Sequence, residues 1–246
     1  METKENIIKL EAVDSTNSYA MKLFADVTIF DFAVIIANEQ TKGRGQHENF
    51  WESEKLLNLT FSIVLRPKLL KARNHFALSQ AVSLGVADFV QLYVDNVSVK
   101  WTNDIYVNND KIAGILIENS ITGENITFSV VGIGININQL IFKSNAPNPI
   151  SLKMLTGNTY DLDECLNLLL KSIKNRIQQL YSSQLSQLNN DYICQLYRIN
   201  IFHCYFAKNK FFFGKITGIT NFGRLIIKKL DGSTIEFDFK EVNFVN

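Results

Sequence analysis

A polar loop at Gln40-Thr-Lys-Gly-Arg-Gly-Gln46 contains residue types that suit an anionic ligand. Two glycines flank Arg44, so the backbone can approach a ligand closely while the guanidinium supplies a permanent positive charge. The spacing matches neither the dinucleotide fingerprint nor the P-loop, because the GxxxxGKS/T pattern is missing. Taken alone, the segment fits a flexible surface loop as well as it fits a binding loop.

A second polar segment is Lys100-Trp-Thr-Asn-Asp104, with Lys111 following seven residues after Asp104. Asn108-Asn109-Asp110 suits a hairpin turn, which would bring two strands together and let Asp104 and Lys111 face one pocket. A lysine can neutralise phosphate, and an aspartate can hold Mg²⁺ or a ribose hydroxyl. The alternative is a solvated cross-strand ion pair that contributes little to stability.

A third segment, Gly132-Ile-Gly-Ile-Asn136, ends an apolar run. Glycine within a strand admits a close neighbour, and the Asn136 amide offers both a donor and an acceptor to a base edge. A simple glycine bulge explains the same pattern when the segment is considered alone.

Strands and helices are expected to alternate around these three segments. A helix capped by Asp14 or Ser15 should run to Phe24, and a longer helix over 161–197 should break near Ser182-Ser183. Further predicted strands cover 7–13, 32–37, 57–65, 97–101, 105–107, 111–118 and 125–137, with a loop over 38–55, a helix over 74–94 and a loop with one helical turn over 138–160. After about residue 200, short β-patterned pieces separated by turn signals predict a small barrel.

The composition excludes several classes of protein. The 246 residues are 46% hydrophobic and 20% charged, which is typical of a globular chain with one large domain or a medium and a small one. A net charge of +1 gives no electrostatic reason to expect nucleic acid or an anionic membrane as the main partner. Three cysteines without CxxC spacing, no signal peptide and no long apolar stretch predict a soluble cytoplasmic protein.

Taken together and in order, the segments resemble the biotin protein ligase family. The resemblance rests on Asp14-Ser-Thr-Asn17, then Gln40 and Gly43-Arg44-Gly45 with Trp51, then KWTNDIYV, KIAGILIE and GIGINI. It covers about residues 8–140. It implies an α+β fold with a central mixed β-sheet flanked by helices, as in catalytic domains related to class II aminoacyl-tRNA synthetases. That domain would span 1–198, and a small SH3-like β-barrel would span 199–246.

The resemblance also implies an activity and a set of site residues. Such a ligase adenylates biotin with ATP and Mg²⁺, then transfers biotin to a lysine of a biotin carboxyl carrier protein. Lys111 and Arg44 would be catalytic, and Asp104 is a candidate metal ligand. By motif position, biotin would contact Ser15, Thr16, Asn17, Gln40, Arg44, Gly45, Gln46, Lys111 and Gly114, and the nucleotide would contact Trp51, Asn136, Lys111 and Asp104.

Two places depart from the family pattern. His47 and Glu48 stand where arginine and glycine are common, with Asn49 after them, and Thr102 replaces a usual proline. Positive φ costs more for glutamate than for glycine, so residues 41–50, the expected lid, should close differently or more slowly. Without proline, the KWTND turn should be slightly looser.

Other functions remain as alternatives. A lipoate ligase of related fold would adenylate a different acid, and a non-catalytic biotin or nucleotide sensor would bind without turnover. The chain begins at the first catalytic strand, so we expect no DNA-reading domain, and we expect no membrane partner. No serine or cysteine is placed with a histidine as a nucleophile, which predicts no covalent enzyme intermediate. Both a monomer and a homodimer stay open.

Overall fold

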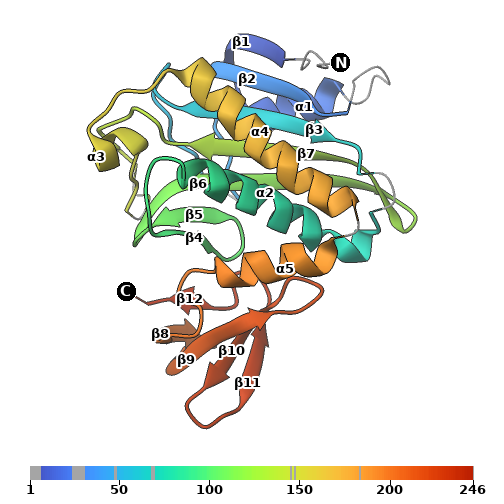
Figure 1. The fold of residues 1–246 in the computed structure, drawn as a ribbon, viewed down its shortest axis with the longest axis vertical. Helices are drawn as coiled ribbons and strands as arrows, with labels where there is room; N and C mark the ends of the chain where they lie inside the picture. Colours follow the sequence, from blue (N-terminus) through green and yellow to red (C-terminus); the bar gives the residue numbers. More distant parts are fainter. Residues whose placement is uncertain are drawn as a thin grey trace.

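A computed structural model describes residues 7–23, 31–46, 49–67, 70–144, 146, 148–182 and 184–245 (Figure 1). Its main element is a seven-stranded mixed sheet in the order β1-β2-β3-β7-β6-β5-β4. β1 and β2 are parallel and every other neighbouring pair is antiparallel. The strands are β1 (Ile7–Val13), β2 (Ala33–Gln40), β3 (Leu59–Leu65), β4 (Val97–Lys100), β5 (Asp104–Val107), β6 (Asp110–Thr122) and β7 (Asn125–Ile135). The predicted fold class is confirmed.

Two helices cover one face of this sheet. α2 (Phe76–Val90) and α4 (Leu162–Tyr181) run next to one another across the sheet in Figure 1. α2 contacts β4, β5 and β6 as well as α4, which explains why nearly all of its side chains are buried. The two helices approach closely at Gly85, where an added Cβ would lie 2.6 Å from the Cα of Ile173. A larger residue would force the helices apart.

α1 (Thr16–Leu23) packs on the other face of the sheet. Alternate residues of β3 point to opposite faces. Val64 joins a small core with Ala20 of α1, while Ile63 and Leu65 join the main core beneath α2 and α4. Of the two caps expected from the sequence, Ser15 precedes the helix and its hydroxyl accepts from the Ser18 N–H at 3.5 Å. The predicted end at Phe24 lies outside the described residues.

Three short helices connect the larger elements: η1 (Ala72–Asn74), α3 (Leu152–Thr156) and α5 (Leu185–Cys194). α3 is the single helical turn expected within 138–160. Ser151 caps it by accepting from the Met154 N–H at 3.2 Å, and Gly157 ends it at a positive φ of 78°. The long helix predicted over 161–197 is interrupted after Ser182, as expected, while Ser183 itself lies outside the described residues.

A second, antiparallel sheet follows in the order β11-β10-β9-β8-β12. Its strands are β8 (Phe202–Ala207), β9 (Lys210–Ile219), β10 (Leu225–Lys229), β11 (Thr234–Phe237) and β12 (Asn243–Phe244). It lies beyond α5 and β4 in Figure 1 and contacts the first sheet through Trp101, whose indole N–H donates to the Gly223 carbonyl at 2.8 Å. The described helices include none long and apolar enough to cross a membrane.

Several predicted boundaries differ from the structure. The helix expected over 74–94 is the shorter α2 (Phe76–Val90), and two strands are longer than expected. The loop expected from residue 38 starts later, because β2 continues pairing with β1 as far as Val13↔Gln40. The strand expected over 111–118 runs on to Thr122, because β7 supplies partners as far as Asn125. Both extensions consist mainly of polar residues, which an apolar pattern does not detect.

Candidate functional site

Two neighbouring cavities lie beside β6. The first is where the end of β2 and the start of α1 meet β6 and β7, and the second lies beside β5 and residues 142–144. The first has a volume of about 170 Å³ and the second about 430 Å³. Trp51, Asp104 and Lys111 line both, so these side chains form the boundary between them. Of the residues singled out from the sequence, Ser15, Thr16, Asn17, Gln40, Arg44, Gly45, Gln46 and Gly114 line the first cavity, and Asn136 lines the second. The structure therefore brings all of them together.

Polar side chains at the start of α1 are held in place at the first cavity. Ser15, Thr16 and Asn17 are all buried. The Thr16 backbone N–H donates to Gln40 Oε1 at 2.7 Å, and the Thr16 hydroxyl donates to the same atom at 3.1 Å. Ser62 on β3 donates to Asn17 Oδ1 at 2.6 Å and was not singled out from the sequence. These bonds orient the donors and acceptors before any ligand arrives.

The glycines of β7 make room for two of these side chains. A Cβ at Gly132 would lie 2.3 Å from Asn17 Oδ1, and one at Gly134 would lie 2.2 Å from Trp51 Cε2. Real Cβ atoms do not approach so closely, so each position requires glycine while its neighbour stays in place. The GIGI pattern therefore reflects close approach of site residues to the strand.

Several buried polar atoms here have no hydrogen-bond partner among the described residues. They include Gln46 Oε1, Trp51 Nε1 and Asn136 Oδ1, each belonging to a residue that lines one or both cavities. Buried polar groups are rarely left unpaired, because desolvation without a hydrogen bond is costly. The unpaired atoms are consistent with a ligand that would supply the missing donors and acceptors.

Lys111 and Asp104 form an ion pair at the boundary between the cavities. Lys111 Nζ lies 2.8 Å from Asp104 Oδ1, and both side chains are 24% exposed. The same ammonium lies 5.7 Å from the centroid of the Trp51 ring. The predicted hairpin thus places both groups at one pocket. Lys111 can approach an anion in either cavity.

The carboxylates of the site do not form a dedicated metal centre. Over the part of the chain that the structure describes, no group of three or more histidine, cysteine, aspartate or glutamate side chains can hold a metal ion. Asp104 is a single carboxylate and is already paired with Lys111. The described residues therefore do not fit an all-protein Mg²⁺ site, and the assignment of Asp104 as a metal ligand stays a prediction.

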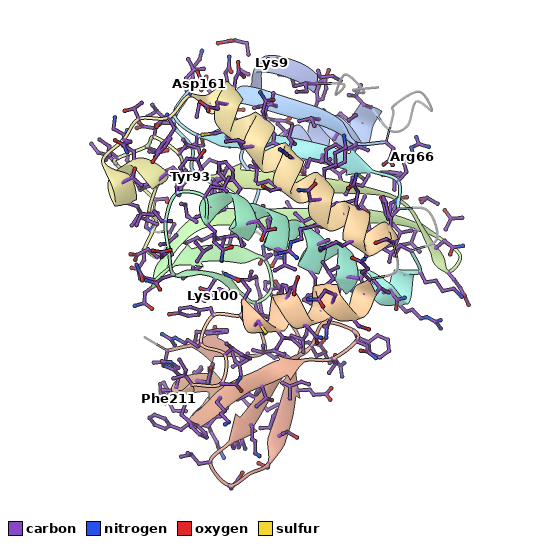
Figure 2. All side chains as sticks on the ribbon, viewed as in Figure 1. Lys9, Arg66, Tyr93, Lys100, Asp161 and Phe211 are labelled. Carbon is purple, nitrogen blue, oxygen red and sulfur yellow. The ribbon has the colours of Figure 1, made fainter. Side chains whose placement is uncertain are left out.

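Lys100 is a second cation that sequence reasoning gave no role, although it lies within the KWTND motif. It lines both cavities and donates to the Tyr106 hydroxyl at 3.0 Å. Its ammonium lies 5.3 Å from the centroid of the Phe244 ring, where the first sheet meets the second (Figure 2). Burial lowers the pKa of Lys100, and this outweighs the nearby Asp104 carboxylate, which raises it; the Arg198 and Lys111 charges lower it further. A half-buried ammonium at this position favours an anionic ligand.

Glu118 was also missed. Arg44 Nη2 lies 2.8 Å from Glu118 Oε1, and Arg44 Nη1 lies 3.3 Å from Glu118 Oε2. Asn17 donates to the same carboxylate at 2.9 Å. In the sequence Glu118 is only the last residue of KIAGILIE, so nothing marks it as a partner of Arg44.

The loop carrying Arg44 folds back on itself. The Gly45 N–H donates to the Asn49 carbonyl at 2.7 Å, and the Trp51 N–H donates to the Gly43 carbonyl at 3.0 Å. A Cβ at Gly43 would lie 2.4 Å from the Trp51 carbonyl oxygen, which explains the glycine there. His47 and Glu48 lie outside the described residues, so their expected effect on lid closure stays a prediction.

Glu52 binds the backbone of a segment that lines the second cavity. Its carboxylate accepts from the backbone N–H groups of Lys143 and Ser144, each at 2.7 Å. Burial pushes the pKa of Glu52 up, but hydrogen bonds from Ser144 and Lys143 outweigh it and lower the pKa overall. The ionised carboxylate therefore fixes the segment that carries Phe142 and Ser144 at the cavity.

Comparison with known proteins places the chain in a family. Residues 10–136 match the model of the biotin/lipoate A/B protein ligase family. A biotin–(acetyl-CoA-carboxylase) ligase of Paracoccus denitrificans is 30% identical, over 77% of this chain and 80% of that protein. The bifunctional ligase/repressor BirA of Bacillus subtilis is 26% identical, over 93% of this chain and 71% of that protein. The structure of a biotin protein ligase from Aquifex aeolicus in complex with biotin and ATP superposes with a TM-score of 0.81 at 26% identity, over 99% of this chain and 100% of that chain. The chain belongs to the biotin/lipoate A/B protein ligase family.

Proposed function

We propose that this chain is a biotin protein ligase that adenylates biotin with ATP and transfers it to a lysine of a biotin carboxyl carrier protein. The observation that carries the proposal is the pair of cavities that meet at Lys111 and Asp104. A reaction that joins a carboxylate to a nucleotide phosphate needs two neighbouring binding sites, with a positively charged side chain between them to offset the repulsion of the two anions. The names of the relatives, which include biotin ligases, support the same assignment.

The first cavity is assigned to biotin and the second to the nucleotide. Thr16, Asn17 and Gln40 supply fixed donors and acceptors for a polar ring. Gly114 leaves room beside Lys111, because a Cβ added at Gly114 would lie 3.4 Å from Lys111 Nζ. In the second cavity, Trp51 offers an aromatic face and an unpaired N–H, and Asn136 offers an unpaired carbonyl oxygen. These groups suit a purine base.

The first step joins two like-charged groups. A biotin carboxylate oxygen attacks the α-phosphorus, the bond to the β-phosphate oxygen breaks, and pyrophosphate leaves with the electron pair. Lys111 and Arg44 offset the repulsion between the anions and hold them in line. We expect Mg²⁺ to enter with the ATP phosphates rather than to bind the protein alone.

The second step uses the neutral amine of the carrier lysine. The amine attacks the carbonyl carbon of the biotinyl-adenylate, an amide bond forms, and AMP leaves with the electron pair of the cleaved bond. The mixed anhydride must be kept from water until the amine arrives. We expect residues 41–50 to cover it, because Arg44 and Gly45 line the first cavity.

The test is incubation of the chain with biotin, MgATP and a carrier domain, followed by detection of biotin on the carrier. Lys111→Ala should abolish adenylate formation while leaving the circular dichroism spectrum unchanged. Lys171→Ala, an exposed lysine on α4, is the matched control and should remain active. Modification with lipoate in place of biotin would favour a lipoate ligase, and ligand binding without AMP release would favour a sensor.

A further inference from the structure

The pair between Arg44 and Glu118 joins two segments that are far apart in the chain. Arg44 is in the loop that covers the first cavity and lines that cavity. Glu118 is on β6 and is not among the lining residues. The Arg44 side chain is 46% exposed and that of Glu118 is 27% exposed, so the carboxylate is the more sheltered partner. Glu118 can therefore affect a ligand in the cavity only through the residues it holds.

The Glu118 carboxylate is itself fixed by the core of the site. Asn17 donates to Oε2 at 2.9 Å, and Asn17 accepts from the buried Ser62 hydroxyl at 2.6 Å. The Ser18 hydroxyl oxygen also accepts from Arg44 Nη1 at 3.3 Å. The arginine thus reaches a rigid acceptor built from α1, β3 and β6. Such a site holds a guanidinium in one orientation.

Other bonds attach the base of the loop. The Thr41 and Lys42 N–H groups donate to the carbonyls of Val13 and Asp14, each at 2.9 Å. Further along, the hydrogen bonds of Gly45 are made within the loop, to Asn49. Among the hydrogen bonds made by the described residues 43–46 and 49–51, those between Arg44 and Glu118 are the ones that reach the sheet.

We infer that Glu118 is a positioning residue that holds Arg44, and with it the neighbouring described residues 43–46, over the first cavity. In this way it retains the biotinyl-adenylate until the acceptor lysine arrives. The inference rests on the proposed function and adds to it the residue on which retention depends. In the opposite role, Glu118 would be an internal anion that competes with the substrate for Arg44. The two roles give opposite results.

Glu118→Gln separates them. The amide keeps the shape and still accepts from Asn17, but it loses the charge that pairs with both guanidinium nitrogens. The measured quantity is the fraction of the adenylate that escapes from the site. In one assay, without carrier, it is the AMP released per adenylate formed. In a second assay, with a bystander protein, it is the biotin that appears on the lysines of that protein. We expect both to rise by about five-fold, the factor that corresponds to about 1 kcal/mol for one bidentate pair.

A double-mutant cycle tests whether Glu118 acts through Arg44. Arg44→Met should raise escape by a similar factor, and Glu118→Gln should add nothing in the Arg44→Met background. Glu118→Asp retains the charge on a shorter side chain and should restore part of the retention. The matched control is Glu11→Gln, which breaks the exposed pair between Glu11 and Lys55 and should leave escape at the wild-type level.

Three results would overturn the inference. Tighter biotin binding by Glu118→Gln with unchanged escape would make Glu118 a competitor. Additive effects in the double variant would mean that Glu118 does not act through Arg44. If Glu118→Gln does not fold, unchanged escape from Arg44→Met contradicts the inference on its own, because that residue is half exposed. A fourth result, a wild-type chain that forms no adenylate, would contradict the inference and the proposed function together, whereas the first three leave the proposed function intact.

Discussion

Replacing either of two glycines on β7 by alanine should weaken the binding of one substrate and leave the binding of the other unchanged. Gly132 lies against Asn17 at the first cavity, and Gly134 lies against Trp51 at the boundary with the second. The two positions are two residues apart on one strand, so their side chains would point to the same face. Gly134→Ala should therefore raise the KM for ATP, and Gly132→Ala should raise the KM for biotin.

The size of the effect follows from the space available. An added Cβ would lie 2.2 Å from Trp51 Cε2 in one variant and 2.3 Å from Asn17 Oδ1 in the other. Each neighbour must therefore move by about 1.2–1.8 Å to reach van der Waals contact. Overpacking of this kind costs about 1–3 kcal/mol, which corresponds to a change of about 5- to 150-fold in a binding constant.

The two variants should also differ in stability. Trp51 belongs to a partly exposed loop and its ring can swing away, so Gly134→Ala should lower Tm little. Asn17 is buried and bonded to Ser62, so Gly132→Ala should lower Tm by about 2–4 °C for each kcal/mol of strain. The assays are steady-state adenylation with each substrate varied in turn, and thermal unfolding without ligand.

Equal increases in both KM values for either variant would refute the assignment of the two cavities. An increase in the biotin KM for Gly134→Ala alone would reverse it. Unchanged kinetics in both variants would mean that Trp51 and Asn17 do not contact the substrates at all.

Three further substitutions test other parts of the structure. The ionised Glu52 should stabilise the fold above its unfolded-state pKa of 4.5, and this contribution is lost as pH falls through the lower folded pKa. The Tm difference between wild type and Glu52→Gln should therefore shrink in that acid range, and a constant difference would contradict this. Gly85→Ala should cost about 1–3 kcal/mol in urea unfolding, because its Cβ would lie 2.6 Å from the Cα of Ile173; wild-type stability would rule out the close helix contact. Trp101→Phe loses the hydrogen bond to Gly223 and should cost about 1 kcal/mol, seen as a lower unfolding midpoint; an unchanged midpoint would show that this bond contributes nothing.

The motifs made much of the site predictable. Arg44 flanked by glycines, Lys111 after a turn and Asn136 at the end of an apolar run each have a residue type and a local context that indicate chemistry. The buried strand at 57–65 and the interrupted helix after 161 follow from apolar spacing alone. These features depend on neighbours in the chain, which the sequence displays directly.

Residues that act across the sheet could not be found in the same way. Ser62 and Glu118 matter because β3, β7 and β6 lie side by side, and that order is set by pairing between distant segments. The polar end of β2 at Asn38-Glu39-Gln40 is a strand only because β1 runs parallel to it. Lys100 lies beside the ring of Phe244, a residue near the other end of the chain, so its surroundings are not visible in the sequence around it.

The contact between the two sheets has a consequence for engineering this chain. Phe239, which follows the last long strand of the second sheet, lines the first cavity beside Trp101. A stop codon after residue 198 would remove part of the cavity wall and expose an indole that is now 7% exposed. A cut at the predicted boundary between residues 198 and 199 would separate the two sheets, but it would also divide the lining of the first cavity. A chimera that takes the C-terminal segment from a relative would therefore also need that relative's residues at the facing side of the cavity, such as the one at position 101.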